Sequence, residues 1–247
     1  MEKTKAKISF IIPAYNCAET IEETVDSIYN GTFETGFEVI VVDDASTDDT
    51  KEILQKLSQK YTQFIILKHR INKKTAAAAR NTAIDHSTND LIFTLDSDNV
   101  LIPGSIQKLL HYLEEEKAEA AVFGEIWFCQ GTTNNVTQKW VFTKEIKAQD
   151  PLSTNITPCP TGNYLFTKAS WLRAGRYFEP TIINQTLDSW TFGIRQLFTG
   201  TKMVCLPNSY YLHRTGINSH WVRENKKGNL SLAALVAIIP FLDKFVE

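Results

Sequence analysis

Short apolar runs alternate with amphipathic segments along the first half of the chain. Strand-like apolar runs occupy residues 8–12, 39–42, 64–67, 91–95 and 120–128. Between them, apolar residues recur at helical spacing, which predicts helices over about 18–29, 48–57, 75–85 and 103–113. Strands and helices that alternate in this way are typical of a mostly parallel sheet with helices on both faces. The first half of the chain is therefore predicted to form such an α/β unit.

The alternation stops after Phe128. A polar turn follows at 130–135, and residues 150–162 form a loop rich in proline and threonine. With no linker in between, we expect a single domain over 1–247, in which a mixed half at about 126–220 packs against the α/β half at about 1–125. The apolar segment at about 229–247 predicts a C-terminal helix packed on the domain. The alternative is a helix that contacts a membrane surface or a partner.

Composition and charge leave the predicted fold unchanged and argue against one class of function. The 247 residues are 43% hydrophobic and 22% charged, which is typical of a globular protein with a sizeable core. A formal net charge of −2, without a basic stripe, argues against a nucleic-acid-binding module. A phosphate-bearing ligand would therefore have to be held by local basic groups, backbone amides or a metal ion.

The cysteines and the apolar segments bear on the cellular compartment. The four cysteines are scattered and form no C-x-x-C pair, which argues against a zinc site or a disulfide framework and favours a reducing cytosol. The first apolar run is too short for a signal peptide, and no stretch of about 18 apolar residues could span a membrane. We expect a cytoplasmic protein, with the inner face of the membrane as the alternative location. The sequence predicts no particular oligomeric state.

Polar residues follow three of the predicted strands at the point where each strand ends. They are Pro13–Asn16, Asp43–Ser46 and Asp96–Asn99. In open α/β sheets, ligands bind in the crevice beyond the carboxyl ends of the strands. These three stretches are therefore where a binding site or an active site is expected.

The segment LDSDN (95–99) carries the clearest chemistry. Asp96 and Asp98 follow a buried strand with one residue between them, and their carboxylates would repel each other without a cation nearby. Mg²⁺ and Mn²⁺ prefer such oxygen ligands, completed by water and phosphate. The alternative is that both residues only cap the turn. At the second strand end, Asp44 either caps the next helix or accepts hydrogen bonds from a base or ribose, and the ring of Tyr15 could flank a planar base.

Taken in order, these and three further segments resemble the inverting nucleotide-sugar glycosyltransferases of family 2, which have the GT-A fold. The resemblance covers about residues 6–215. It rests on PAYN (13–16), VVDDAS (41–46), KTAAAARNTAI (74–84), LDSDNVLIPG (95–104), TGNYLFTKASWLRAGRYFEP (161–180) and LDSWTFGIRQLFTG (187–200). It implies a Rossmann-like, mostly parallel sheet with helices on both faces, plus a mixed acceptor-side region.

The resemblance also implies roles for individual positions. The positions that match the family's nucleotide-sugar site are Pro13, Ala14, Tyr15, Asn16, Asp44, Arg80, Asp96 and Ser97. The matches to the metal site are Asp98 and His213, with Arg214 as an alternative phosphate contact. Asp188 matches the general base, and the matches on the acceptor side are Gly162, Asn163 and Trp190. Two other tryptophans, Trp127 and Trp171, could line a sugar site, but we expect them in the core.

The function that the resemblance implies is metal-dependent, inverting sugar transfer from a nucleotide-diphosphate donor to a hydroxyl. The donor expected from the family is a UDP-sugar, the cofactor is Mn²⁺ or Mg²⁺, and the acceptor is a glycan, a glycolipid or a protein. Leu187 replaces an acid that usually precedes the base, Asn72–Lys74 replaces glycines, and Asn99 replaces an aspartate. Leu187 leaves open a degenerate domain that binds nucleotide or glycan without turnover. A nucleotidyltransferase is disfavoured because the segment after the first strand has no glycine-rich phosphate loop.

Overall fold

The computed structural model describes residues 7–31, 33–34, 36–142, 162–179 and 188–216. The predicted alternation of strands and helices is present in the first half. In order, its elements are β1 (Ile8–Ala14), α1 (Ile21–Tyr29), β2 (Phe37–Asp43), α2 (Thr50–Lys60), β3 (Phe64–Lys68), α3 (Ala76–His86), β4 (Leu91–Thr94), β5 (Val100–Leu101) and α4 (Ser105–Glu115). The second half contributes β6 (Ala120–Gln130), β7 (Val136–Val141), β8 (Leu165–Thr167), α5 (Lys168–Arg173), α6 (Asp188–Phe198) and β9 (Met203–Thr215).

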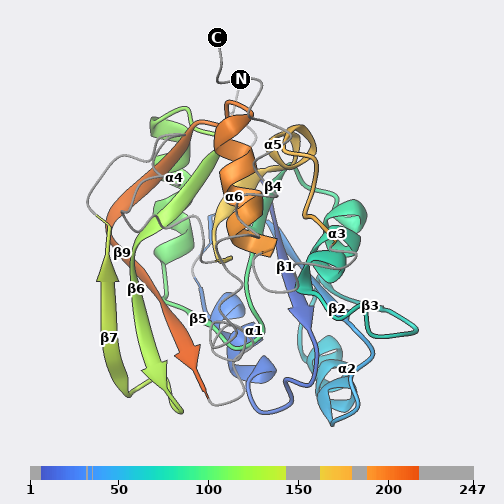
Figure 1. Ribbon diagram of the computed structural model, residues 1–247. Coiled ribbons are helices and arrows are strands. Elements are labelled where there is room, and N and C mark those ends of the chain that lie inside the picture. The colour runs from blue at the N-terminus through green and yellow to red at the C-terminus, as the bar shows by residue number, and fades with distance from the viewer. Residues whose placement is uncertain (1–6, 32, 35, 143–161, 180–187, 217–247) are drawn as a thin grey trace, which may run out of the picture.

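One nine-stranded sheet joins both halves, in the order β3-β2-β1-β4-β8-β6-β9-β5, with β7 added beside β6. The strands β3, β2, β1 and β4 are parallel, as predicted. The short strand β8 is antiparallel to both β4 and β6, and β9 runs parallel to β6. Figure 1 shows the parallel strands on one side of the molecule and β6, β7 and β9 on the other. The sheet is therefore parallel in the first half and mixed in the second.

Alternate residues of the central strands pack into two cores on opposite faces of the sheet. On one face, Ile8, Phe10 and Ile12 of β1 pack in a cluster with residues of α1, α2 and α4. On the other face, Ile11 lies in a cluster with residues of α3, α5 and α6. This arrangement follows from the two-residue period of a β-strand, which points successive side chains to opposite faces. Helices cover both faces, as the sequence predicts.

The two tryptophans expected in the core differ in their surroundings. Trp171 is 1% exposed and lies in the second core, so that prediction is confirmed. Trp127 is partly exposed and stacks on Tyr210, with 3.7 Å between the ring centroids and 8° between the planes. The Lys139 ammonium lies 3.4 Å from the centroid of the Trp127 ring, so two side chains already cover this tryptophan.

In the described ranges, no helix is both long enough and apolar enough to span a lipid bilayer. The C-terminal helix expected at about 229–247 lies outside these ranges.

Candidate active site

The ends of β1 and β2 are fastened to each other. The backbone amide of Asn16 donates to Ser46 Oγ (3.0 Å), and the Thr47 amide donates to Asn16 Oδ1 (2.8 Å). Ala14 is buried, and only its backbone reaches this edge, where its carbonyl accepts from the Asp44 amide (2.8 Å). Tyr15 is 50% exposed, so its ring is open to a ligand. The strand-end loops form one connected edge, as the sequence predicts.

Asp44 is buried in a hydrogen-bond network that the sequence analysis only partly anticipates. Its Oδ1 lies 2.5 Å from His69 Nδ1, and the Lys73 amide donates to Oδ1 and Oδ2 (3.0 and 2.9 Å). The other ring nitrogen of His69 lies 3.0 Å from Thr82 Oγ1 on α3. His69 follows directly after β3, and the sequence analysis searched only the ends of the first, second and fourth strands. Applying the same rule to the third strand would have found it.

Arg80 is placed by the alanine-rich helix α3. Ala77, Ala79 and Ala83 are buried against the sheet, and their small side chains let the helix backbone approach it closely. The Arg80 side chain is only 4% exposed, and its Nη2 lies 2.5 Å from Asp96 Oδ1. Arg80 therefore holds Asp96 in place, which is a more specific role than the basic position near the donor that the resemblance implies.

Two acceptor-side residues of the prediction lie against Asp96. The Asp96 amide donates to Asn163 Oδ1 (2.7 Å), and Asn163 Nδ2 donates to Asp96 Oδ2 (3.3 Å). Gly162 has a φ of +76°, and a Cβ built on it would lie 3.4 Å from Asp96 Oδ2 and 3.0 Å from Ser189 Oγ. The residues that lead into β8 therefore lie against the Asp96 carboxylate, just after β4.

Asp98 and His213 have the chemistry of ligands for a hard divalent ion. Burial, and then the charge of Asp96, raise the pKa of Asp98 to about 7, and the charge of Arg214 offsets only part of this rise. Burial lowers the pKa of His213, which leaves the imidazole neutral and able to bind a metal. The Asn99 amide nitrogen lies 3.4 Å from both Asp96 Oδ2 and His213 Nδ1 and joins the two sides. Carboxylate oxygen and imidazole nitrogen suit Mn²⁺, with phosphate or water to complete the shell.

Among the described side chains, no group of three or more His, Cys, Asp or Glu residues is arranged to hold a metal ion. A cation held by Asp98 and His213 would therefore take its other ligands from substrate or solvent, as Mg²⁺ commonly does.

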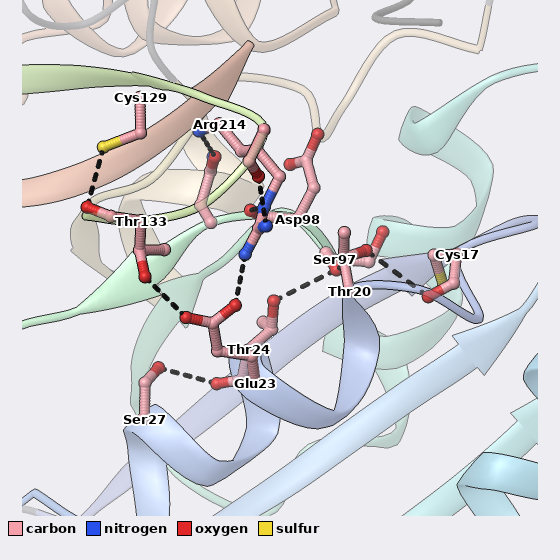
Figure 2. Close-up of polar contacts among 12 residues, drawn as sticks. Cys17, Thr20, Glu23, Thr24, Ser27, Ser97, Asp98, Cys129, Thr133 and Arg214 are labelled. Atoms are coloured by element: carbon pink, nitrogen blue, oxygen red, sulfur yellow. Dashed lines mark hydrogen bonds and ion pairs between the residues drawn. The ribbon is translucent and has the colours of Figure 1, made fainter. Parts of the chain in front are cut away.

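Arg214 lies behind the Asp96–Asn99 loop and not in the open site. Its Nε donates to the Asp98 carbonyl (3.1 Å), and its Nη1 donates to the Gly131 carbonyl (2.7 Å). Its Nη2 is paired with the Glu23 carboxylate. Figure 2 shows the guanidinium between Asp98 and Glu23. All three guanidinium nitrogens thus donate to protein groups, and a direct contact of Arg214 with phosphate stays a prediction.

Asp188 is the first residue of α6. The structure describes only the backbone of Asp188 and of Trp190. Leu187 lies outside the described residues. The neighbouring Ser189 is buried, and its Oγ would lie 3.0 Å from a Cβ at Gly162. The start of α6 therefore lies beside the Asp96 carboxylate, and the role of Asp188 as a base stays a prediction.

The sequence model described as glycosyl transferase family 2 matches residues 9–174. The chain belongs to glycosyltransferase family 2. This match includes the ends of β1, β2 and β4, where the sequence analysis placed the donor site. The family assignment made from the motifs is thereby confirmed.

Several curated glycosyltransferases resemble the chain. A putative teichuronic acid biosynthesis glycosyltransferase of Bacillus subtilis, TuaG, is 28% identical over 229 residues, or 92% of this chain and 87% of the relative. The Escherichia coli protein WfaP, a UDP-Glc:alpha-D-GlcNAc-diphosphoundecaprenol beta-1,3-glucosyltransferase, is 40% identical over 110 residues, or 44% of this chain and 42% of the relative. The match likewise spans only 28% of a poly(ribitol-phosphate) beta-glucosyltransferase of Bacillus spizizenii. The chain thus spans less than half the length of two of these three relatives.

Solved structures share the fold. The S. aureus TarS structure with UDP-GlcNAc has a TM-score of 0.71 at 20% identity, over 87% of this chain and 60% of the other. The Pyrobaculum calidifontis mannosyltransferase PcManGT with GDP-Man and Mn²⁺ has a TM-score of 0.69 at 20% identity, over 92% and 62%. The GT-A fold expected from the sequence is confirmed.

Proposed function

We propose that the chain transfers a sugar, with inversion, from a UDP-sugar to a hydroxyl group of a glycan or glycolipid. The observation that carries the proposal is the placement of Asp44 just after β2, and of Asp96 and Asp98 just after β4, at the same edge of the parallel sheet, with Asn99 linking Asp96 to His213. The relatives support it, since TarS was solved with UDP-GlcNAc and WfaP is named for a UDP-Glc donor and a diphosphoundecaprenol-linked acceptor. A lipid-linked acceptor would place the reaction at the cytoplasmic face of a membrane.

Each residue of the site has a task in such a transfer. Asp44 accepts a hydrogen bond from the base, with Tyr15 flanking the ring, and Asp96, held by Arg80, accepts hydrogen bonds from the ribose or the sugar. Asp98 and His213 hold Mn²⁺ or Mg²⁺, which when bound neutralises charge on the diphosphate leaving group. Such a cation would favour the ionised form of Asp98, whose pKa is about 7 without metal.

Asp188 is the proposed base on the acceptor side. An alcohol is a weak nucleophile, so a carboxylate at the start of α6 would take its proton as the new glycosidic bond forms. Attack from the side opposite the departing diphosphate inverts the anomeric carbon. The position of the α6 backbone next to Gly162 and Asp96 supports this role, because the base must lie across the sugar from the leaving group.

Nucleotide binding tests the proposal. Thermal unfolding is measured with UDP, GDP, dTDP and CDP, each with Mn²⁺ or EDTA, for wild type, Asp98→Ala and the surface control Asp85→Ala. A ligand at about 100 times its dissociation constant stabilises the folded state by about 2.7 kcal/mol. We expect UDP to stabilise wild type and Asp85→Ala more strongly with Mn²⁺ than in EDTA, and Asp98→Ala to lose this metal-dependent gain. If no nucleotide stabilises wild type under any condition, the proposal is wrong.

Turnover separates an enzyme from a binding domain. We expect the wild type to release UDP from UDP-glucose or UDP-GlcNAc in the presence of Mn²⁺, and faster when an acceptor glycolipid is added. UDP binding without any release of UDP would instead favour the degenerate domain that Leu187 suggests.

A further inference from the structure

The loop that carries Asp98 is held from behind by two elements. On one side, Thr20 and Thr24 of the α1 region both donate to the Ser97 carbonyl (2.9 and 3.0 Å). On the other side, Arg214 of β9 donates from Nε to the next carbonyl, that of Asp98 (3.1 Å). Figure 2 shows these donors converging on the loop from α1 and from β9. These hydrogen bonds hold two consecutive backbone carbonyls, so the backbone that carries the Asp98 side chain is held in place.

Arg214 also fixes the side chain that joins the two proposed metal ligands. Its backbone amide donates to Asn99 Oδ1 (3.0 Å), while the Asn99 amide nitrogen lies 3.4 Å from His213 Nδ1. Because Asn99 Oδ1 accepts from this amide, Asn99 Nδ2 faces the imidazole as a donor, so the neutral ring carries its proton on Nε2 and Nδ1 keeps the lone pair that a cation would need. The same arginine therefore sets the backbone of Asp98 and the orientation of the His213 partner.

Arg214 is held in turn by a second layer of contacts. Its side chain is 15% exposed and is paired with Glu23 of α1, whose other carboxylate oxygen accepts from Thr133 Oγ1 (2.7 Å). Burial would raise the pKa of Glu23, but the hydrogen bonds from Thr133 and Arg214 and the arginine charge lower it, so the pair stays ionised at neutral pH. Arg214 Nη1 reaches the Gly131 carbonyl in the β6–β7 turn (2.7 Å). Three separate segments therefore meet on one guanidinium.

We propose that Arg214, held by Glu23 and Thr133, is a positioning residue that sets the Asp96–Asn99 loop and His213 for binding a divalent cation with the nucleotide diphosphate. This inference rests on the proposed function. Its basis is geometric: a planar guanidinium with donors in fixed directions matches two carbonyls and a carboxylate at once. Groups that orient metal ligands typically contribute about 10–100-fold to metal affinity.

The test is the affinity for Mn²⁺ and UDP, measured by calorimetry on Arg214→Met. The matched control is Arg173→Met, because Arg173 also bonds a backbone carbonyl (Thr199), a threonine hydroxyl (Thr201) and a glutamate (Glu119). We expect Arg214→Met to bind Mn²⁺ about 10–100-fold more weakly in the presence of UDP, with the affinity for UDP in EDTA unchanged. Arg173→Met should lower thermal stability without changing either affinity.

A second set of variants keeps the test valid if Arg214→Met is unstable. Glu23→Gln retains an acceptor for Arg214 and should weaken Mn²⁺ binding less than Glu23→Ala. If Arg214→Met folds, adding Glu23→Ala to it should have no further effect on Mn²⁺ affinity, because the two residues act as one unit.

The outcomes for this inference and for the proposed function are distinct. If wild type binds UDP and Mn²⁺ together, and Arg214→Met and Glu23→Ala bind Mn²⁺ as tightly as wild type, the inference is wrong and the proposed function stands. If wild type binds no nucleotide with Mn²⁺, both are wrong.

Discussion

His69 holds Asp44 through a contact of 2.5 Å between Nδ1 of the ring and Oδ1 of the carboxylate. The Nε2 of the same ring lies 3.0 Å from Thr82 Oγ1, so a residue of α3 fixes the ring and the ring fixes the carboxylate. A carboxylate that reads a base must point in one direction before the nucleotide arrives. His69 and Thr82 supply that direction.

Replacing His69 should therefore weaken nucleotide binding. Hydrogen bonds to charged groups contribute about 1.5–3 kcal/mol, so we expect His69→Leu to bind UDP at least about 10-fold more weakly. Thr82→Val should have a smaller effect, and His111→Leu, at an exposed histidine of α4, should have none. Calorimetry with UDP in EDTA measures the base contribution apart from the metal. An unchanged affinity in His69→Leu would remove Asp44 from the proposed base-binding role.

The raised pKa of Asp98 predicts a pH-dependent response to metal. Its carboxyl has a pKa of about 7 in the folded protein against the ordinary value of 3.8 for an aspartate, so folding favours the protonated form. In the metal-free protein this contribution to stability is complete below about pH 4 and is lost as the pH rises through 7. A cation competes with the proton, so stabilisation by Mn²⁺ should grow over the same interval.

Melting temperatures between pH 5 and pH 8, in EDTA and in Mn²⁺, check this. The difference between the two curves should widen with pH in wild type and stay constant in Asp98→Asn, which has no carboxyl to titrate. A difference that is independent of pH in wild type would contradict the assignment of Asp98 as the metal ligand.

Asp188→Asn should separate chemistry from binding. Loss of a general base typically slows the reaction by about 10²–10⁴-fold, so kcat should fall by that factor. The donor site does not include Asp188, so the affinity for UDP with Mn²⁺ should stay at the wild-type value. If kcat is retained, another group removes the proton from the acceptor.

Gly162→Ala should damage the site more than the fold. Gly162 and Gly200 both have positive φ values, +76° and +83°, and a left-handed conformation costs an alanine about 1–2 kcal/mol. A Cβ at Gly162 would press on Ser189 and approach Arg80 and Asp96, whereas nothing lies within 4 Å of one at Gly200. Both variants should melt at a lower temperature, but only Gly162→Ala should lose UDP affinity. Equal UDP affinities in the two variants would show that Gly162 does not border the donor site.

The sequence predicts the fold where its periodicity is long enough to be recognised. The helices α1 and α4 carry clear apolar stripes, and β1, β2 and β4 are mostly apolar and buried. The three residues of β8 and the two of β5 are too few to show a period, so their antiparallel places in the sheet could not be predicted.

The candidate site divides in the same way. The acidic strand ends, Asp44, Asp96 and Asp98, could be found because the carboxyl ends of parallel strands meet at one edge. The groups that hold these residues depend on tertiary contacts: Arg80, which pairs with the Asp96 carboxylate, is 16 residues from it, and Arg214, which donates to the Asp98 carbonyl, is 116 residues from it. Spacing along the chain carries no sign of such pairs, and the position of Arg214 behind the loop could be learned only from the structure.

The helix α3 packs closely on the sheet, and it contacts both halves of the proposed site. Its consecutive residues Arg80 and Asn81 reach different halves of the chain. Arg80 pairs with Asp96, and Asn81 bonds the Tyr177 backbone and the Glu179 carboxylate. If a larger side chain at Ala77 lifted the helix, both contacts would shift together. The proposed donor and acceptor sites would then move relative to each other. The alignment of two substrates therefore depends on the small volume of one alanine side chain.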